Sequence, residues 1–175
     1  MTIADEHIVS IMTQEPEKGF RLLMNKYQEP VYWHIRRMLQ AHDDAQDVAQ
    51  NTFVKIFRTM DKLFAVNSLR SWIYKVATNE ALSFLRTRKE QVCQLDEVMA
   101  ERMPADEYFN YDNLEAVKLQ KAIQSLPTKQ GLTFNLRYYD ELSYDEIASV
   151  IGSTATSAKS NYHIAKEKII KYMNA

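Results

Sequence analysis

Three carboxylates and three amides gather within one short run of the chain, DDAQDVAQN at residues 43–51. Clustered carboxylates can exchange protons in catalysis or hold a divalent cation. Asp44, Asp47 and Gln50 recur at intervals of three, so a helix would place them along one side of its first turns. His42 is the only imidazole near them in the sequence, and no glycine-rich loop accompanies them. An acidic helix start that faces a basic partner explains this run better than an active site or metal site does.

The other reactive side chains are scattered along the sequence. The single cysteine, Cys93, has no neighbouring cysteine or histidine at metal-ligand spacing. The four histidines, His7, His34, His42 and His163, form no ligand group either. No nucleophile elbow or phosphate-binding loop is present. We therefore predict a protein that is not an enzyme and that needs no metal or cofactor.

A second motif, SYDEIASVIG at residues 143–152, specifies a helix and the turn that ends it. Ser143 and Glu146 have the spacing of a capping box, which fixes the first residue of the helix. Gly152 can adopt the left-handed conformation that stops the helix abruptly. A further helix is expected from about Thr154, so the pair has the form of a helix-turn-helix.

The helix that follows Gly152 has one apolar and one polar side. Small and aromatic residues recur at spacings of three and four on the expected inner side, at Ala155, Ala158, Tyr162, Ala165, Ile169 and Tyr172. The expected outer side carries hydroxyls, lysines and an imidazole, at Thr154, Thr156, Lys159, Ser160, His163 and Lys166. These groups can contact phosphates and base edges in a major groove. The pattern favours DNA binding over a helical hairpin with a merely solvated face.

A third candidate surface lies on the helix expected at residues 69–89. Ser71, Lys75, Asn79, Arg86 and Lys89 fall in one polar stripe, opposite an apolar face that contains Trp72. We expect Ser68 to cap this helix and Glu80 to need a basic partner. The preceding loop carries Phe64 and Asn67, which could hold an unstacked base. Aromatic groups beside a basic stripe suit single-stranded DNA.

Helices must position all three surfaces. Three glycines and four prolines in 175 residues, with little strict alternation of apolar and polar residues, argue against a β-rich fold. Apolar residues instead recur with helical periodicity, and they predict that Val48, Phe53, Ile56 and Phe57 face inward. Pro30 should kink or restart the second helix. The expected helices cover residues 5–13, 16–40, 44–63, 69–89, 114–126, 127–139, 143–151 and 154 onward.

The distribution of charge divides the chain although its net charge is only −1. Residues 62–89 carry a net charge of +5 and residues 117–175 carry +3, while residues 90–116 carry −7. We predict an all-α protein with two small helical domains, at residues 1–89 and 114–175, joined by an acidic linker at residues 90–113. No apolar stretch is long enough for a membrane span and no secretory signal is visible, so we expect a cytoplasmic protein without membrane insertion.

Taken together, these motifs resemble the extracytoplasmic-function (ECF) group of bacterial sigma factors, the promoter-specificity subunits of RNA polymerase. The run DAQDVAQNTF at 44–53 is similar to region 2.2, and the resemblance implies docking on the β′ clamp coiled coil through Asp44, Asp47, Val48, Gln50, Asn51 and Phe53. The run SLRSWIYKVATN at 68–79, with Leu85 and Arg86, is similar to regions 2.3 and 2.4. It implies reading and melting of the minus-ten element by Phe64, Asn67, Ser68, Arg70, Lys75, Asn79 and Arg86.

The C-terminal domain resembles sigma region 4, through Leu126-Pro127, the YDEIA run at 144–148, and Lys159-Ser160. The resemblance implies that the last helix reads the minus-thirty-five element, that the partners are core RNA polymerase and promoter DNA, and that an anti-sigma factor could bind. The acidic linker would enter the RNA exit path of the polymerase. This chain departs from the family at Asn161 and Ile164, where arginines are common, and at Ala158, where valine is commoner.

Two other classes of protein remain as alternatives. A helix-turn-helix regulator would use only residues 114–175 and would keep the N-terminal helices as a sensor or dimerisation module. It would need a ligand pocket or phosphoacceptor. A helical enzyme would use Asp43, Asp44 and Asp47, and metal-dependent turnover lost in Asp47→Ala would support it.

Overall fold

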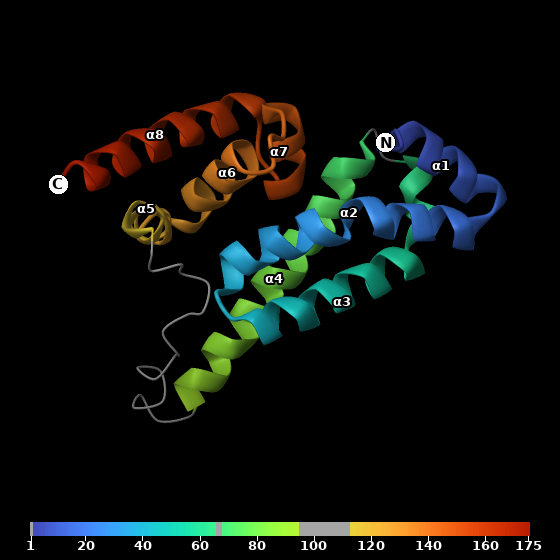
Figure 1. Cartoon of the computed structure of the whole chain (residues 1–175), viewed down its shortest axis with the longest axis horizontal. Helices are drawn as coiled ribbons and strands as arrows, with labels where there is room; N and C mark the ends of the chain where they lie inside the picture. The colour runs from blue at the N-terminus through green and yellow to red at the C-terminus, as the bar shows by residue number, and fades with distance from the viewer. Residues whose placement is uncertain (1, 66–67, 95–112) are drawn as a thin grey trace. The chain divides into compact units, whose positions relative to one another are not determined.

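The computed structural model describes residues 2–65, 68–94 and 113–175, which form eight α-helices and one 3₁₀ helix and contain no strand (Figure 1). The prediction of an all-α fold is confirmed. The chain forms two compact units, Met1–Asp106 and Glu107–Ala175. Most of the predicted linker, residues 95–112, lies outside the described residues.

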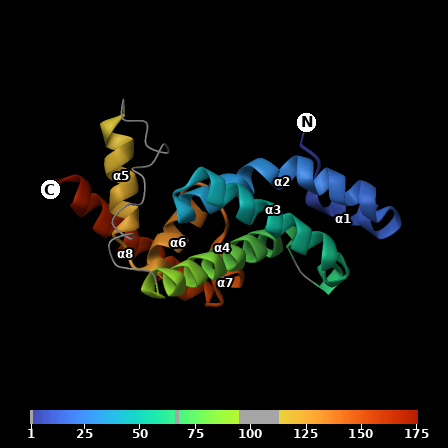
Figure 2. The same cartoon turned by 90° about the horizontal axis from the view of Figure 1, so that it is seen from below.

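The first unit is a bundle of four α-helices. Figures 1 and 2 show α2, α3 and α4 lying side by side, with α1 against α2. Its elements in chain order are α1 (Asp5–Gln14), α2 (Pro16–Leu39), α3 (His42–Arg58), the 3₁₀ helix η1 (Met60–Ala65) and α4 (Leu69–Gln94).

The first helix is held against α2 by a close crossing and a polar anchor. Gly19 of α2 is buried where a Cβ atom would lie only 2.1 Å from Cγ of Met12, so the crossing requires glycine. The Asp5 carboxylate accepts hydrogen bonds from the Tyr27 hydroxyl, at 2.7 Å and 2.9 Å, and from Lys26 Nζ at 2.6 Å. Lys26 also donates to the carbonyl of Ile3 at 2.9 Å. These contacts fix α1 although its N-terminus lacks a side-chain cap.

The second helix runs through Pro30 without a break and ends at Gln40, whose φ of 67° is left-handed. Asp43 and Asp44 have a residue type that often caps helices, but neither of them caps the next helix. The N-cap residue of α3 is Ala41, which makes no side-chain cap, while Asp43 and Asp44 lie in the first turn. There they still favour the helix because its N-terminal end is the positive end of the dipole. The helix ends at Arg58, earlier than expected.

The buried contact between α2 and α4 includes an imidazole. His34 is completely buried, and its Nε2 lies 2.8 Å from the Thr78 hydroxyl. The Tyr74 ring meets its edge, with ring centroids 5.2 Å apart. Burial, and next the positive charge of Arg37, lower the pKa of His34 from 6.5 to about 3. The side chain therefore serves as a neutral part of the core.

The second unit contains α5 (Leu114–Gln124), α6 (Thr128–Tyr138), α7 (Tyr144–Ile151) and α8 (Ala155–Met173). Its buried core contains Ala122, Ile123, Phe134, Ala165 and Ile169, with partly buried residues around them. One of these, Tyr162, stacks on Phe134 with an interplanar angle of 15°. The prediction that Tyr172 also faces inward is wrong, because it is 38% exposed.

Candidate functional sites

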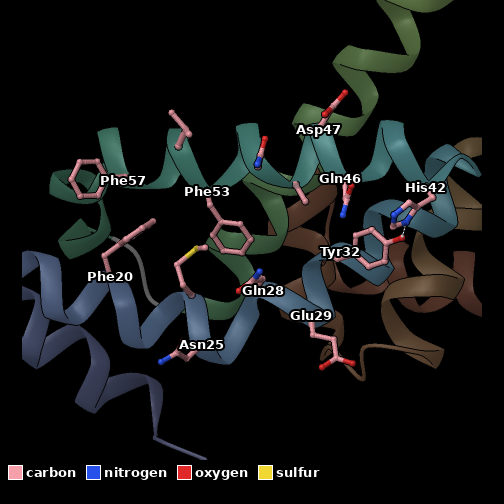
Figure 3. A pocket seen from close by; sticks show the side chains of 14 residues that line it. Phe20, Asn25, Gln28, Glu29, Tyr32, His42, Gln46, Asp47, Phe53 and Phe57 are labelled. Carbon is pink, nitrogen blue, oxygen red and sulfur yellow. Dashed lines mark hydrogen bonds between the residues drawn. The ribbon is translucent and has the colours of Figure 1, made fainter.

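An open groove of about 930 Å³ runs between α2 and α3 (Figure 3). Phe53, which is only 5% exposed, lies in its floor, and Phe20 and Phe57 meet edge to face with centroids 5.1 Å apart. Two of the predicted docking residues, Asp47 and Gln50, are exposed on its α3 side. The groove therefore combines an aromatic floor with an acidic and amide rim.

The wall that α2 contributes to the groove was missed by the sequence reasoning. It consists of Phe20, Met24, Asn25, Gln28, Glu29 and Tyr32. The hydroxyl of Tyr32 lies 2.5 Å from Nδ1 of His42, so this hydrogen bond joins α2 to the first turn of α3. Phe57 was predicted to face inward, but it is 48% exposed. Its position one turn after Phe53 gave no signal of this exposure, because residues four apart share a helix face and Phe53 is buried.

Asp44 has a different environment from Asp47 and does not line the groove. Its carboxylate pairs with the guanidinium of Arg88, near the end of α4. The same guanidinium lies 5.7 Å from the centroid of the Phe84 ring. The pair thus ties the start of α3 to α4, so Asp44 is engaged inside the unit.

The remaining predicted docking residues differ in access. Val48 is 3% exposed and belongs to the core, so it has almost no surface of its own to offer a partner. Asn51 is exposed but lies outside the groove lining. Phe53 is reached only through the groove. The structure therefore gathers Asp47, Gln50 and Phe53 and separates the others from them.

The outer face of α4 carries the predicted polar stripe, with Lys75, Asn79 and Arg86 exposed. Ser71 is an exception, because it is 6% exposed. Its hydroxyl donates to the carbonyl of Ser68 at 3.1 Å. This stripe can run along a nucleic-acid strand, since Lys75, Asn79 and Arg86 supply positive and amide groups.

Ser68 caps α4 as predicted, because its Oγ accepts from the amide of Ser71 at 3.2 Å. Arg70 is half-buried in the next turn. Phe64 belongs to η1, but its side chain and the whole of Asn67 lie outside what the structure describes. The basic partner expected for Glu80 is Lys55 of α3, at 2.9 Å.

The helix-turn-helix of the second unit is formed as expected. Ser143 Oγ accepts from the Glu146 amide at 3.1 Å, and Glu146 Oε1 accepts from the Ser143 amide at 3.2 Å. Gly152 has φ 68° and ψ 45°, the left-handed conformation that ends α7. Thr154 then caps α8, since its Oγ1 accepts from the amide of Ser157 at 3.1 Å.

The polar face of α8 is exposed along its first three turns. All six predicted residues are exposed: Thr154, Thr156, Lys159, Ser160, His163 and Lys166. Ala158 is completely buried on the opposite side, which allows a close approach to α7. A helix of about 10–12 Å diameter with a free polar face fits a DNA major groove.

Within the described residues, no three histidine, cysteine or acidic side chains are grouped as a metal site would need. None of the helices in the described part of the chain has the length and apolar character of a membrane span. The arrangement that the structure does present is an open groove in the first unit and exposed basic helix faces in both. These features define a DNA-binding adaptor.

Comparison with protein families covers both units. The chain matches the family described as Sigma-70 region 2 over residues 23–91 and the family described as Sigma-70, region 4 over residues 116–169. The two matches together cover well over half of the chain. The first match covers most of α2, all of α3 and most of α4, so these helices belong to a sigma domain, where a helix-turn-helix regulator would have an unrelated sensor.

Curated relatives match over nearly their whole length. The chain is 28% identical over 178 residues to the ECF RNA polymerase sigma-E factors of Salmonella typhimurium and Escherichia coli, covering 95% of this chain and 93% of theirs. It is also 28% identical to the RNA polymerase sigma-H factor of Pseudomonas aeruginosa, covering 95% and 92%. The similarity therefore extends through both units and the segment between them.

Two solved structures share the fold. The sigma factor RpoE of Bartonella quintana, in complex with the anti-sigma factor NepR, matches with a TM-score of 0.75 and 20% identity over 90% of this chain and 98% of that one. CnrH, in complex with the cytosolic domain of CnrY, matches with a TM-score of 0.73 and 16% identity over 98% of each chain.

The fold and the exposed faces define a promoter-specificity factor, a class that links a polymerase to DNA. The chain belongs to the sigma-70 family and, within it, to the extracytoplasmic-function group. It is a transcription initiation factor that binds core RNA polymerase and directs it to promoters.

Proposed function

We propose that the groove between α2 and α3 is the surface through which this chain docks on the clamp coiled coil of the polymerase β′ subunit. The observation that carries the proposal is the aromatic floor at Phe53 beneath a rim of Asp47 and Gln50. A partner helix could pack a row of apolar side chains against the aromatic floor. Basic side chains beside that row would contact the acidic rim. Asp44 and Val48 would act from within the unit by holding α3 in place.

The exposed stripe of α4 is proposed to contact the minus-ten element. Lys75, Asn79 and Arg86 supply a cationic and amide surface, which suits a displaced DNA strand. The predicted base-holding loop at Phe64 and Asn67, with Ser68 and Arg70, remains part of this proposal. The N-terminal domain would then dock on the polymerase and open the promoter with two different faces.

The exposed face of α8 is proposed to read the minus-thirty-five element from the major groove. Lys159 and Lys166 can contact phosphates, while Thr156, Ser160 and His163 can reach base edges. Thr154 would act mainly by capping the helix whose first turns enter the groove.

Further parts of the proposal concern organisation and regulation. The functional domains are taken as residues 1–89 and 114–175, with an acidic linker at 90–113. The chain would act in the cytoplasm without catalysis of its own, because the polymerase performs the chemistry. An anti-sigma factor is a further partner, supported by the structural neighbour RpoE, which was solved with the anti-sigma factor NepR. Such a factor would have to cover the docking groove or a basic face.

Substitution of the groove rim tests the docking proposal. Asp47→Arg combined with Gln50→Ala should abolish co-purification with core RNA polymerase and run-off transcription, because it reverses the charge of the rim. Both positions are exposed, so the helical content and the unfolding midpoint should stay unchanged. Asp61→Arg is the matched control, since it makes the same charge change at an exposed position outside the groove lining. If the double variant still binds core polymerase like the control, the groove is not the docking surface.

A further inference from the structure

Ile164 is a large apolar side chain within the otherwise polar outer face of α8. It is 41% exposed. It follows Ser160 by four residues and Thr156 by eight, so the three lie in one row along the helix. Lys159 and His163, both exposed, border this row. Contact between apolar surface and water is unfavourable, so an isoleucine in that position is stabilised when a partner covers it.

The position of Ile164 along α8 places it within reach of DNA. It is the tenth residue of the helix, so it lies about 14 Å from the first residue at a rise of 1.5 Å per residue. A major groove is about 12 Å wide, and a recognition helix inserts its N-terminal part. The other exposed large apolar residues of α8, Ile170 and Tyr172, lie nearer the C-terminal end. Ile164 alone among these three lies beside the residues proposed to read bases.

Base-pair chemistry then selects the group that Ile164 can recognise. Its side chain offers no hydrogen bond, so it cannot distinguish the donors and acceptors of the groove. The C5-methyl group of thymine is the apolar group that base pairs present there. Building on the proposed role of α8, we propose that Ile164 reads an A·T pair of the upstream promoter element by packing against the thymine methyl group.

Replacement of thymine by deoxyuridine tests this contact, because uracil lacks only that methyl group. The holoenzyme, formed from core polymerase and the full chain, first selects its preferred upstream element from a randomised library. Each thymine of both strands is then replaced singly, and the dissociation constant of the holoenzyme is measured. Replacement at one pair should weaken binding about fourfold, the effect of removing one methyl-sized group from a buried contact.

Variants assign the effect to this side chain. Ile164→Ala should bind the thymine and deoxyuridine promoters equally, while Ile170→Ala, also exposed on α8 at 50%, should keep the fourfold difference. Ile164→Arg should shift the selected base at that pair toward guanine, which arginine recognises with two hydrogen bonds.

Three results would overturn the inference while leaving the function of the chain intact. They are a selected element without an A·T pair near the reading helix, equal binding of thymine and deoxyuridine promoters by the wild type, or a methyl effect that persists in Ile164→Ala. Weaker binding of Ile164→Ala to core polymerase without DNA would instead assign the side chain to a protein contact. If the holoenzyme selects no upstream element at all, the proposed role of α8 fails and the inference fails with it.

Discussion

The stability of the first unit should depend on pH through His34. The experiment lowers the pH of the wild type and of a double variant, His34→Leu with Thr78→Val. The double variant lacks both the imidazole and the hydroxyl that is its hydrogen-bond partner. Replacing both partners avoids leaving one buried polar group unsatisfied. We expect the wild type to lose much more stability than the double variant between pH 7 and pH 5.

The magnitude follows from the lowered pKa. Burial and the charge of Arg37 lower the pKa of His34 from 6.5 to about 3, so between these values the unfolded chain binds a proton that the folded chain rejects. The free energy of unfolding therefore has its highest value, as far as His34 is concerned, above pH 6.5. It falls as the pH decreases from 6.5 toward 3. Since one pKa unit corresponds to about 1.4 kcal/mol, the loss at pH 5 is about 2 kcal/mol.

Urea unfolding followed by tryptophan fluorescence can measure this loss within one unit. The chain has two tryptophans, Trp33 and Trp72, and both belong to the first unit, on the helices that enclose His34. Free energies of unfolding at pH 7, 6 and 5 give the pH dependence of each variant. The second unit contains no tryptophan and so adds no signal of this kind.

The pH dependence of the double variant decides whether the reasoning is correct. Between pH 7 and pH 5, the double variant should lose about 2 kcal/mol less free energy of unfolding than the wild type loses. His7→Gln removes an exposed histidine of the same unit and should keep the wild-type dependence. Equal losses in the wild type and the double variant would refute the assignment of acid sensitivity to His34.

Two further predictions concern contacts within the first unit. Gly19→Ala should lower the free energy of unfolding by about 1–3 kcal/mol, because the new Cβ would overlap Met12, and the same urea titration checks it. A Gly19→Ala variant as stable as the wild type would contradict the close crossing of α1 and α2. Asp44→Ala should weaken core polymerase binding less than Asp47→Ala in a titration with labelled core enzyme, because Arg88 already engages Asp44. Equal losses would mean that both carboxylates contact the partner.

The sequence predicted the elements whose ends have local causes. The capping box at Ser143, the left-handed turn at Gly152 and the cap at Ser68 formed as expected, because each depends on residues within a few positions. Helical periodicity likewise gave the all-α class and the exposed side of α8. The start of α3 was misjudged, since Asp43 and Asp44 have the residue type of a cap but lie within the first turn of the helix.

The candidate sites differ in how much of them a sequence can reveal. The polar face of α8 is one helix face, so spacing alone predicted its members. The docking groove needs two helices, and its α2 wall, including Tyr32 and Glu29, has no local pattern that assigns it to a shared surface. The partner of Asp44 was also unpredictable, because Arg88 lies 44 residues away along the chain.

The sequence by itself determined the helical class, the boundaries that caps and turns specify, and the family of sigma factors to which the chain belongs. Each of these follows from residue type and short-range spacing. Only the tertiary structure decided that Phe57 is exposed beside Phe20, that Asp44 pairs with Arg88 while Asp47 lies at the rim of the groove, and that His34 is buried against Thr78. The physical reason is that burial and pairing depend on how separate helices pack, and a helical repeat specifies a face without specifying what covers it.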